Sequence, residues 1–206
     1  MRHQHIFLIL GVAATTVFSP EAPAETDWRT EAVAMTKRDF QGKGQAGYER
    51  IHEDALQAAC NKTANNPPQA LAARITQAQQ KTVKYPADGT LMGDWKSGEK
   101  IAQSGKGLTW DDDPELPAGG NCYNCHRISP KEISYGTLGP SLLNFGKLRG
   151  GPSPEMQKYT YGKIYNAKSY NACANMPRFG YVGALNEQQI KDLVALLLDP
   201  ESPVNQ

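Results

Sequence analysis

Hydrophobic residues recur at helical spacing in several separate segments, and the clearest pattern lies near the C-terminus. A helix is expected to begin at Asn186, with an apolar face formed by Ile190, Leu193, Val194 and Leu197. Asn186 followed by Gln189 forms a weak capping pair at the start, and Pro200 predicts the end. Two further helices are expected, an amphipathic one over residues 94–103 and one over residues 154–170 with Tyr161, Ile164 and Tyr165 facing inward.

The region before residue 93 shows thinner patterns. Residues 25–40 are polar with a weak helical pattern, and residues 48–60 carry apolar positions at helical spacing. After a break at Pro67 and Pro68, a third stripe is formed by Leu71, Ile75, Ala78 and Thr82. We therefore predict an all-α protein in which residues 25–92 are a helical extension that packs on a larger domain, residues 93–206.

The first residues have the pattern of an export signal. A short basic start is followed by an apolar stretch, residues 6–18, and then by Ala22-Pro23-Ala24, which has the small-x-small form of a cleavage site. The apolar stretch is too short to span a hydrocarbon core of ~30 Å, which disfavours the alternative of an uncleaved anchor. We predict a signal peptide over residues 1–24, cleavage after Ala24, and a periplasmic protein with no membrane anchor.

The net charge and the cysteine content limit the kinds of partner and cofactor that we expect. Lys and Arg total 22 against 21 for Asp and Glu, a net charge of +1, which favours neither nucleic acid nor an anionic membrane as a partner. The four cysteines are Cys60, Cys122, Cys125 and Cys173. In an oxidising compartment cysteines form disulfides or hold cofactors.

Two of these cysteines lie in a motif with a specific chemistry. The run Cys122-Tyr123-Asn124-Cys125-His126 is a C-x-x-C-H haem-attachment motif. Two thiols one turn apart can add to the two vinyl groups of one haem, and the following histidine then faces the iron. We predict one covalent haem c. The alternatives are half of a zinc site, completed by Cys60, Cys173 or His52, or a redox-active dithiol.

A methionine is the expected second axial ligand of the iron. Met176 precedes a proline, which favours an extended backbone suited to a loop that presents the sulfur. Met156 is the main rival, His52 a more distant one, and a core methionine the structural alternative. Ligation by methionine and histidine raises the reduction potential above that of a bis-histidine haem.

Residues beyond the ligands support the haem assignment. Gly139-Pro140-Ser141-Leu142 resembles the segment of class I cytochromes c that lies behind the proximal histidine. This resemblance implies that the Pro140 carbonyl orients His126 and that Leu142 packs on the haem. An ordinary turn is the alternative.

Cys60 and Cys173 remain as a candidate disulfide. The bond would connect the extension to the segment just before Met176 and close a loop of more than 100 residues. Such a closure stabilises by up to ~4–5 kcal/mol in the chain-entropy model. Free thiols or an intermolecular bond are the alternatives.

The segments around these motifs resemble a particular family of sulfur-oxidation cytochromes. They are Gly93-Asp94-Trp95-Lys96, Ile101-Ala102-Gln103-Ser104-Gly105, Gly120 to His126, Gly136 to Leu142, Tyr159-Thr160-Tyr161, Lys163 to Ala167, Met176 to Gly180 and Leu196 to Pro200. In this order they are similar to SoxX, the monohaem subunit of the SoxAX complex, from about Tyr85 to Val204. The region before Tyr85 matches less closely.

The resemblance implies an all-α, class I cytochrome c fold with an N-terminal helical extension, and a role in a heterodimer with SoxA. SoxAX joins thiosulfate to a cysteine of the carrier SoxYZ, an L-cysteine S-thiosulfotransferase reaction that releases two electrons. The bond-forming site is expected on SoxA. Cys122, Cys125, His126 and Met176 would then form an electron relay to a soluble cytochrome, and this chain would hold no catalytic residue.

Three other functions stay open at the sequence level. They are a free periplasmic electron shuttle, a haem-based gas sensor whose methionine dissociates, and a purely structural haem. Basic residues around the expected haem edge could meet an acidic partner or form a solvated face. They are Lys147, Arg149, Lys163, Lys168 and Arg178.

Overall fold

The computed structural model describes residues 27–206, so the predicted signal peptide and its cleavage site lie outside the described residues. Within that range the regular structure is helical, apart from one isolated bridge between Lys43 and Ala46. The α-helices are α1 (Trp28–Asp39), α2 (Ala55–Lys62), α3 (Gln69–Gln80), α4 (Trp95–Gln103), α5 (Phe145–Leu148), α6 (Pro154–Tyr165) and α7 (Glu187–Leu198). Short 3₁₀ helices are η1 (Tyr48–Ile51), η2 (Cys122–Asn124), η3 (Ala167–Ser169) and η4 (Pro203–Asn205). None of the helices in this part of the chain is long and apolar enough to cross a membrane.

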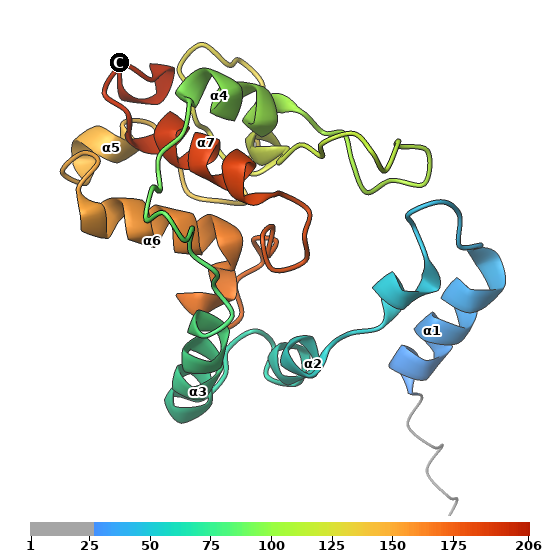
Figure 1. Cartoon of the computed structure of the whole chain (residues 1–206). Coiled ribbons are helices and arrows are strands. Elements are labelled where there is room, and N and C mark those ends of the chain that lie inside the picture. The colour runs from blue at the N-terminus through green and yellow to red at the C-terminus, as the bar shows by residue number, and fades with distance from the viewer. Residues whose placement is uncertain (1–26) are drawn as a thin grey trace, which may run out of the picture.

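Helices α4 and α7 cross closely at the centre of the larger part of the molecule (Figure 1). A side chain on Gly98 would place its Cβ only 2.2 Å from the backbone oxygen of Asp192. Ala102, one turn further along α4, is fully buried. Small residues on one face of α4 thus allow the backbones of α4 and α7 to approach closely.

Helix α7 contributes most of the buried residues of the main core. All its residues from Gln189 to Leu198 are buried, and the predicted capping box is formed, with Asn186 and Gln189 each bonding the other's backbone. The charged Asp192 is buried but has partners, since its carboxylate accepts from the Asp94 amide and from Gln188, at 2.9 and 2.8 Å. Helix α6 and the η4 turn complete this core through Tyr161, Ile164 and Val204.

Two predicted helices have other limits than their apolar patterns suggest, one at its start and one at its end. The stretch 48–60 is not one helix, because Asp54 accepts a hydrogen bond from the Gln57 amide and starts α2 anew after η1. The stretch 154–170 is helical only to Tyr165, because Asn166 leaves the helix with its side chain bonded to the extension. Capping and tertiary bonds override periodicity at both places.

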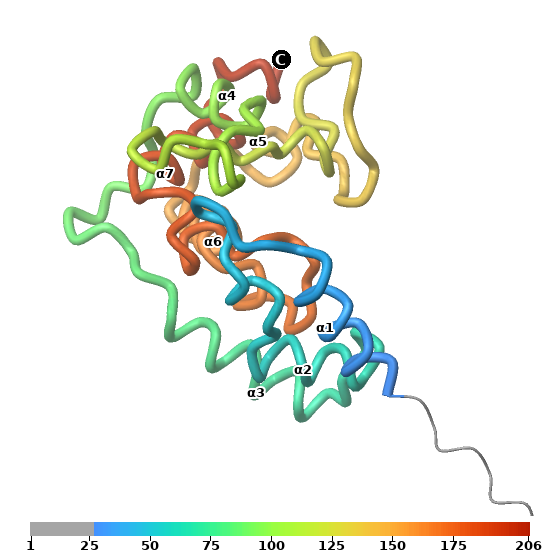
Figure 2. Tube along the Cα trace, turned by 90° about the vertical axis from the view of Figure 1, so that its right-hand side faces the viewer, coloured from blue at the N-terminus to red at the C-terminus, as the bar shows by residue number. Residues whose placement is uncertain are grey.

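The extension is attached to the rest of the chain in two regions. Helices α2 and α3 pack beside the segment after α6, around a small core of Cys60, Ile75, Ala172 and Cys173 (Figures 1 and 2). Of the predicted α3 stripe, Ile75 is buried, Ala78 is exposed and Thr82 lies beyond the helix. Further upstream, Gln45 donates to the Asp112 backbone oxygen at 3.0 Å, and Lys43 lies 4.1 Å from the Trp110 ring centre.

Candidate haem site

The motif cysteines lie on a short turn of 3₁₀ helix that immediately follows a left-handed residue, Asn121. The amides of Cys125 and His126 both donate to the backbone oxygen of Cys122, at 3.1 and 2.9 Å. This tight turn holds the two half-buried thiols and the imidazole on one short piece of backbone.

A second segment, residues 136–142, runs beside the motif and is bonded to it by three backbone hydrogen bonds. The Gly136, Gly139 and Leu142 amides donate at 2.7–2.8 Å to backbone oxygens of the motif segment, on Tyr123, Cys125 and Arg127. The sequence Gly-Pro-Ser-Leu is therefore part of a paired loop and not a free surface turn.

This pairing places a carbonyl against the histidine ring. The Nδ1 atom of His126 lies 2.7 Å from the Pro140 backbone oxygen, and a carbonyl can only accept, so Nδ1 carries the proton. Gly139 allows the contact, because a Cβ there would lie 2.2 Å from His126 Cε1. With Nδ1 engaged, the free lone pair is on Nε2, the atom that a metal would bind.

Half-buried hydrophobic side chains from four parts of the chain lie against the main core. Among them are Cys122, Leu142, Tyr165, Met176 and Phe179. A large flat apolar group that bonds to the two thiols would cover such side chains. The residues present thus fit a covalent haem, which when bound supplies an iron that exchanges one electron.

The thiols do not fit the two alternative uses of the motif. Burial, and after it the neighbouring Cys125, raise the pKa of the free Cys122 thiol to about 12, whereas a redox-active dithiol requires a lowered pKa. A zinc site would need further ligands, and Cys60 and Cys173 are joined to each other in a disulfide. The candidate His52 is exposed on the extension.

The structure places Met176 on the long connection between α6 and α7. We call residues 166–181 of this connection the Met176 loop. Its shape depends on Gly180, where a Cβ would lie 2.3 Å from the Tyr165 ring. Met156 lies in the first turn of α6, and both it and Met176 pack partly buried on the core, whereas Met35 is exposed.

The predicted disulfide is present. Cys60 and Cys173 are bonded over a sequence separation of 113 residues, with Cα atoms 5.6 Å apart. It attaches the extension to the Met176 loop, as the sequence predicted.

The basic residues expected around the haem edge do not form one free surface. Arg178 is paired with Asp54 and its side chain is only 11% exposed, while Lys163 and Lys168 are half-buried. Lys147 and Arg149 remain exposed, and the Arg149 guanidinium lies 4.7 Å from the Phe145 ring centre. Phe179 and Tyr161 lie in or against the core, as expected.

One part of the site was not predicted from the sequence. The Tyr123 hydroxyl donates to Glu99 on α4 at 2.9 Å, and this bond ties the motif to the central helix pair. Burial raises the pKa of Glu99 above its usual value, although the bond from Tyr123 acts in the opposite direction. The sequence near either residue does not indicate this contact. The one hint is that Glu99 is a charged residue on a helix that packs against the core.

Comparison with known proteins agrees with this geometry. The family model for cytochrome c matches residues 102–199, which include the motif, the paired loop, Met176 and all of α7. Residues 102–199 therefore form a cytochrome c domain. The chain is also 35% identical over 204 residues to an uncharacterized lipoprotein of Aquifex aeolicus, covering 97% of this chain and 96% of the relative.

This cytochrome therefore has the all-α, class I cytochrome c fold, and it is a haem c electron-transfer protein. Cytochrome c domains are typically extracellular or periplasmic, in line with the predicted export signal. The N-terminal extension lies outside the matched residues.

Proposed function

We propose that His126 and Met176 are the axial ligands of a single haem attached through Cys122 and Cys125. The contact between His126 Nδ1 and the Pro140 oxygen carries the assignment, because it leaves Nε2 free for the iron. With both His126 and Met176 bound, the iron would have no open position for substrate, which suits electron transfer.

The methionine assignment has a direct spectroscopic test. Met176→Ala should abolish the far-red methionine-to-iron absorption of the oxidised protein, and Met156→Ala should leave it intact. Persistence of the band in Met176→Ala would refute the assignment. Mass spectrometry of the intact protein tests the count of one haem.

We further propose that the chain is the electron-accepting subunit of a SoxAX-type L-cysteine S-thiosulfotransferase. The proposal rests on the SoxX-like segments of residues 85–204. Electrons released when thiosulfate is coupled to a SoxYZ cysteine would pass from SoxA to this haem, and then to a soluble cytochrome.

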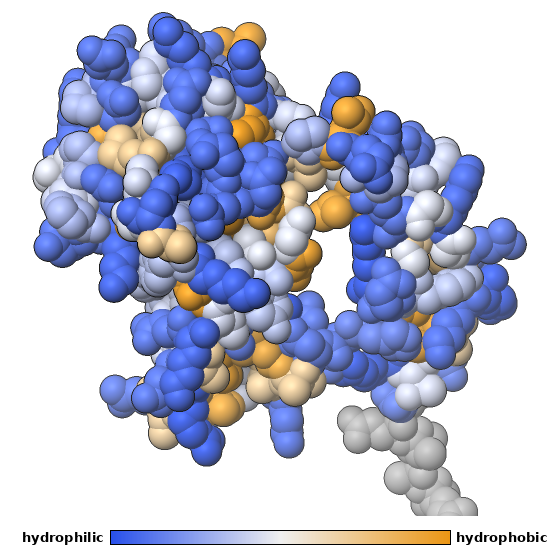
Figure 3. All heavy atoms as spheres, in the orientation of Figure 1, coloured by the Kyte–Doolittle hydropathy of each residue, from blue (hydrophilic) through white to orange (hydrophobic). Residues whose placement is uncertain are grey.

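A diffusible electron shuttle is the second candidate. The face seen in Figure 3 is mostly hydrophilic, with hydrophobic residues in small separate areas, as suits a protein that is free in solution. Native pull-down of the protein, followed by haem staining and mass spectrometry, separates the two. A stoichiometric SoxA-like cytochrome supports the complex, and a lone monohaem protein at full yield supports the shuttle.

The place of the protein in the cell is part of the same proposal. We expect cleavage after Ala24 and release into the periplasm, whereas the name of the Aquifex relative raises a lipid anchor as the alternative. The first cysteine of the sequence is Cys60, and its sulfur is held in the disulfide. Intact mass and partitioning between detergent and water distinguish the two.

A further inference from the structure

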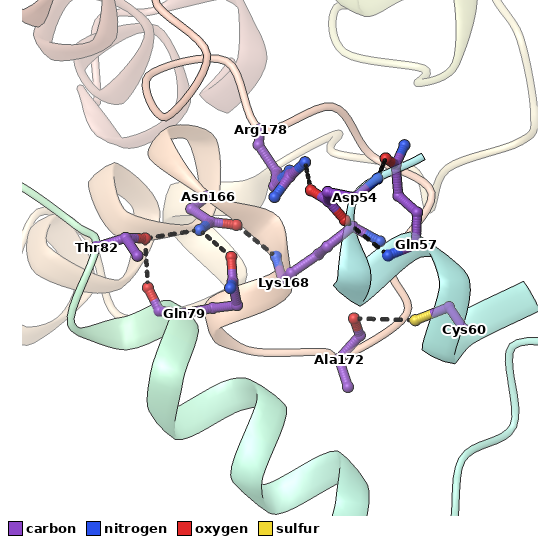
Figure 4. Close-up of polar contacts among 9 residues, drawn as sticks. All are labelled: Asp54, Gln57, Cys60, Gln79, Thr82, Asn166, Lys168, Ala172 and Arg178. Carbon is purple, nitrogen blue, oxygen red and sulfur yellow. Dashed lines mark hydrogen bonds and ion pairs between the residues drawn. The ribbon is translucent and has the colours of Figure 1, made fainter. Parts of the chain in front are cut away.

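Residues of α2, α3 and their ends contact the Met176 loop at positions before and after Met176 in the sequence. Figure 4 shows these contacts at Asn166, Ala172 and Arg178. At the start of the loop, the fully buried Asn166 donates through Nδ2 to Gln79 and to Thr82, each at 2.9 Å. Gln80 donates to the Ser169 backbone oxygen at 3.1 Å. The extension thus satisfies polar groups of the loop that would otherwise be buried without partners.

Two stronger attachments lie closer to the methionine. Three residues before it, the Cys60–Cys173 disulfide joins the loop to α2, inside the small core that also holds Ile75 and Ala172. Two residues after it, Arg178 bonds to Asp54 at 2.5 Å, with the arginine side chain largely buried. Asp54 is itself fixed, because its other carboxylate oxygen caps α2 through the Gln57 amide at 2.7 Å.

The connection between α6 and α7 needs such support. Residues 166–186 contain only the short η3 helix, and a connection of this length without its own structure is expected to sample many conformations. Fixing the residues on both sides of Met176 reduces that freedom to a few residues. A sulfur held in place competes better for the iron than one on a free loop.

We propose that α2 and α3 form a clamp that positions Met176, with the disulfide and the Asp54–Arg178 pair as its nearest attachments. The inference rests on the proposed assignment of Met176 as an iron ligand. It assigns a role to the extension, which lies outside the matched cytochrome c region. Cys60, Cys173, Asp54 and Arg178 are positioning residues that act through Met176.

The test uses imidazole as a competing ligand for the oxidised haem in the full-length protein. Imidazole can bind the iron only in molecules in which Met176 has dissociated from it. The apparent dissociation constant of imidazole therefore falls as the fraction of molecules with dissociated Met176 rises. We expect Cys60→Ser/Cys173→Ser to lower that constant by about tenfold, equivalent to ~1.4 kcal/mol, and Asp54→Asn by about threefold. The far-red absorption should weaken or shift in both variants.

Glu53→Gln is the matched control. Glu53 is next to Asp54, but it bonds to Arg29 and Asn61 within the extension and not to the Met176 loop. It should leave the imidazole constant unchanged. Asp54→Asn keeps the disulfide and serves as the test if the serine double variant does not accumulate.

Met176→Ala separates the two possible failures. If the far-red absorption disappears in Met176→Ala but clamp variants bind imidazole within twofold of the parent, Met176 is the ligand and the clamp is refuted. If the absorption survives in Met176→Ala, the ligand assignment is wrong and the clamp falls with it. Equal effects of Glu53→Gln and Asp54→Asn would also overturn the clamp, because loss of stability in the extension would then explain both.

Discussion

At the scale of single residues, Gly139 is a tight constraint directly beside the histidine ring. Any side chain there would collide with the His126 ring, at 2.2 Å from Cε1. We predict that Gly139→Ala displaces the imidazole from the Pro140 oxygen, reduces haem incorporation and destabilises the fold by about 1–3 kcal/mol. The ratio of haem absorbance to protein and urea unfolding measure both effects.

Gly105→Ala is the control for this prediction. A Cβ at Gly105 would meet Asn121 at 3.4 Å, which is ordinary contact, so haem content should be unchanged. Normal haem content in Gly139→Ala would show that the ring has room to move and that the Pro140 contact does not fix it.

Ionisation of Glu99 should make the stability of the folded protein depend on pH, and the direction of this dependence follows from its surroundings. One of its carboxylate oxygens, Oε2, is buried without a hydrogen-bond partner, and burial raises the pKa of this group in the folded state. The protonated form is therefore favoured on folding. This stability is present below the unfolded pKa of ~4.3 and is lost as pH rises through the folded value.

Glu99→Gln removes the titration and keeps an acceptor for Tyr123. We predict that the variant is more stable than the parent at neutral pH, with a difference that shrinks as the pH approaches 4. Urea unfolding at a series of pH values measures this. A difference that is the same at every pH would mean that packing, and not ionisation, causes the effect.

Residues of the site differ in how far the sequence predicts them. The spacing of Cys122, Cys125 and His126 is local, so the motif is legible in the sequence. The Asp54–Arg178 and Glu99–Tyr123 contacts join residues far apart in the chain, and no pattern near either partner indicates the other. Arg178 illustrates the consequence, since a residue predicted for a partner surface is occupied within the chain.

At the scale of elements, the α4–α7 crossing determines how the domain closes. Gly98 faces the α7 backbone, and a Cβ there would lie 2.2 Å from the Asp192 backbone oxygen. We predict that Gly98→Ala pushes the helices apart and destabilises the protein by about 1–3 kcal/mol, although alanine favours helix by ~1 kcal/mol. Thermal unfolding checks it.

The exposed Lys100, on the same helix, is the matched control. Lys100→Ala changes the side chain on the solvent face and should alter stability by less than about 0.5 kcal/mol. A neutral or stabilising Gly98→Ala would mean that the two backbones are free to separate at little cost.

Helix ends are also predictable where their causes are close in sequence, and not where they depend on residues far away in the chain. The limits of α7 were predicted because its apolar face, its capping box and Pro200 are all close in sequence. The expected helix over residues 154–170 stops at Tyr165, since Asn166 bonds to Gln79 and Thr82 on α3. Periodicity carries no information about such a partner.

At the scale of the whole molecule, the protein contains two hydrophobic cores of very different size. The larger one is built on α4, α6 and α7, while the smaller one consists of Cys60, Ile75, Ala172 and Cys173. So few buried groups cannot offset the conformational entropy of ordering α2 and α3. The disulfide, which closes a loop with a separation of 113 residues, contributes up to ~4–5 kcal/mol in the chain-entropy model.

Removing the disulfide should therefore affect the two cores unequally. We predict that in Cys60→Ser/Cys173→Ser the backbone amides of α2 and α3 lose protection from hydrogen exchange, whereas those of α4 and α7 stay protected, because local openings need not involve the larger core. Mass-spectrometric hydrogen exchange of the haem-loaded protein measures both sets at once. A uniform loss across α2, α3, α4 and α7 would show instead that the two cores unfold as one cooperative unit, in which the extension stabilises the whole cytochrome domain.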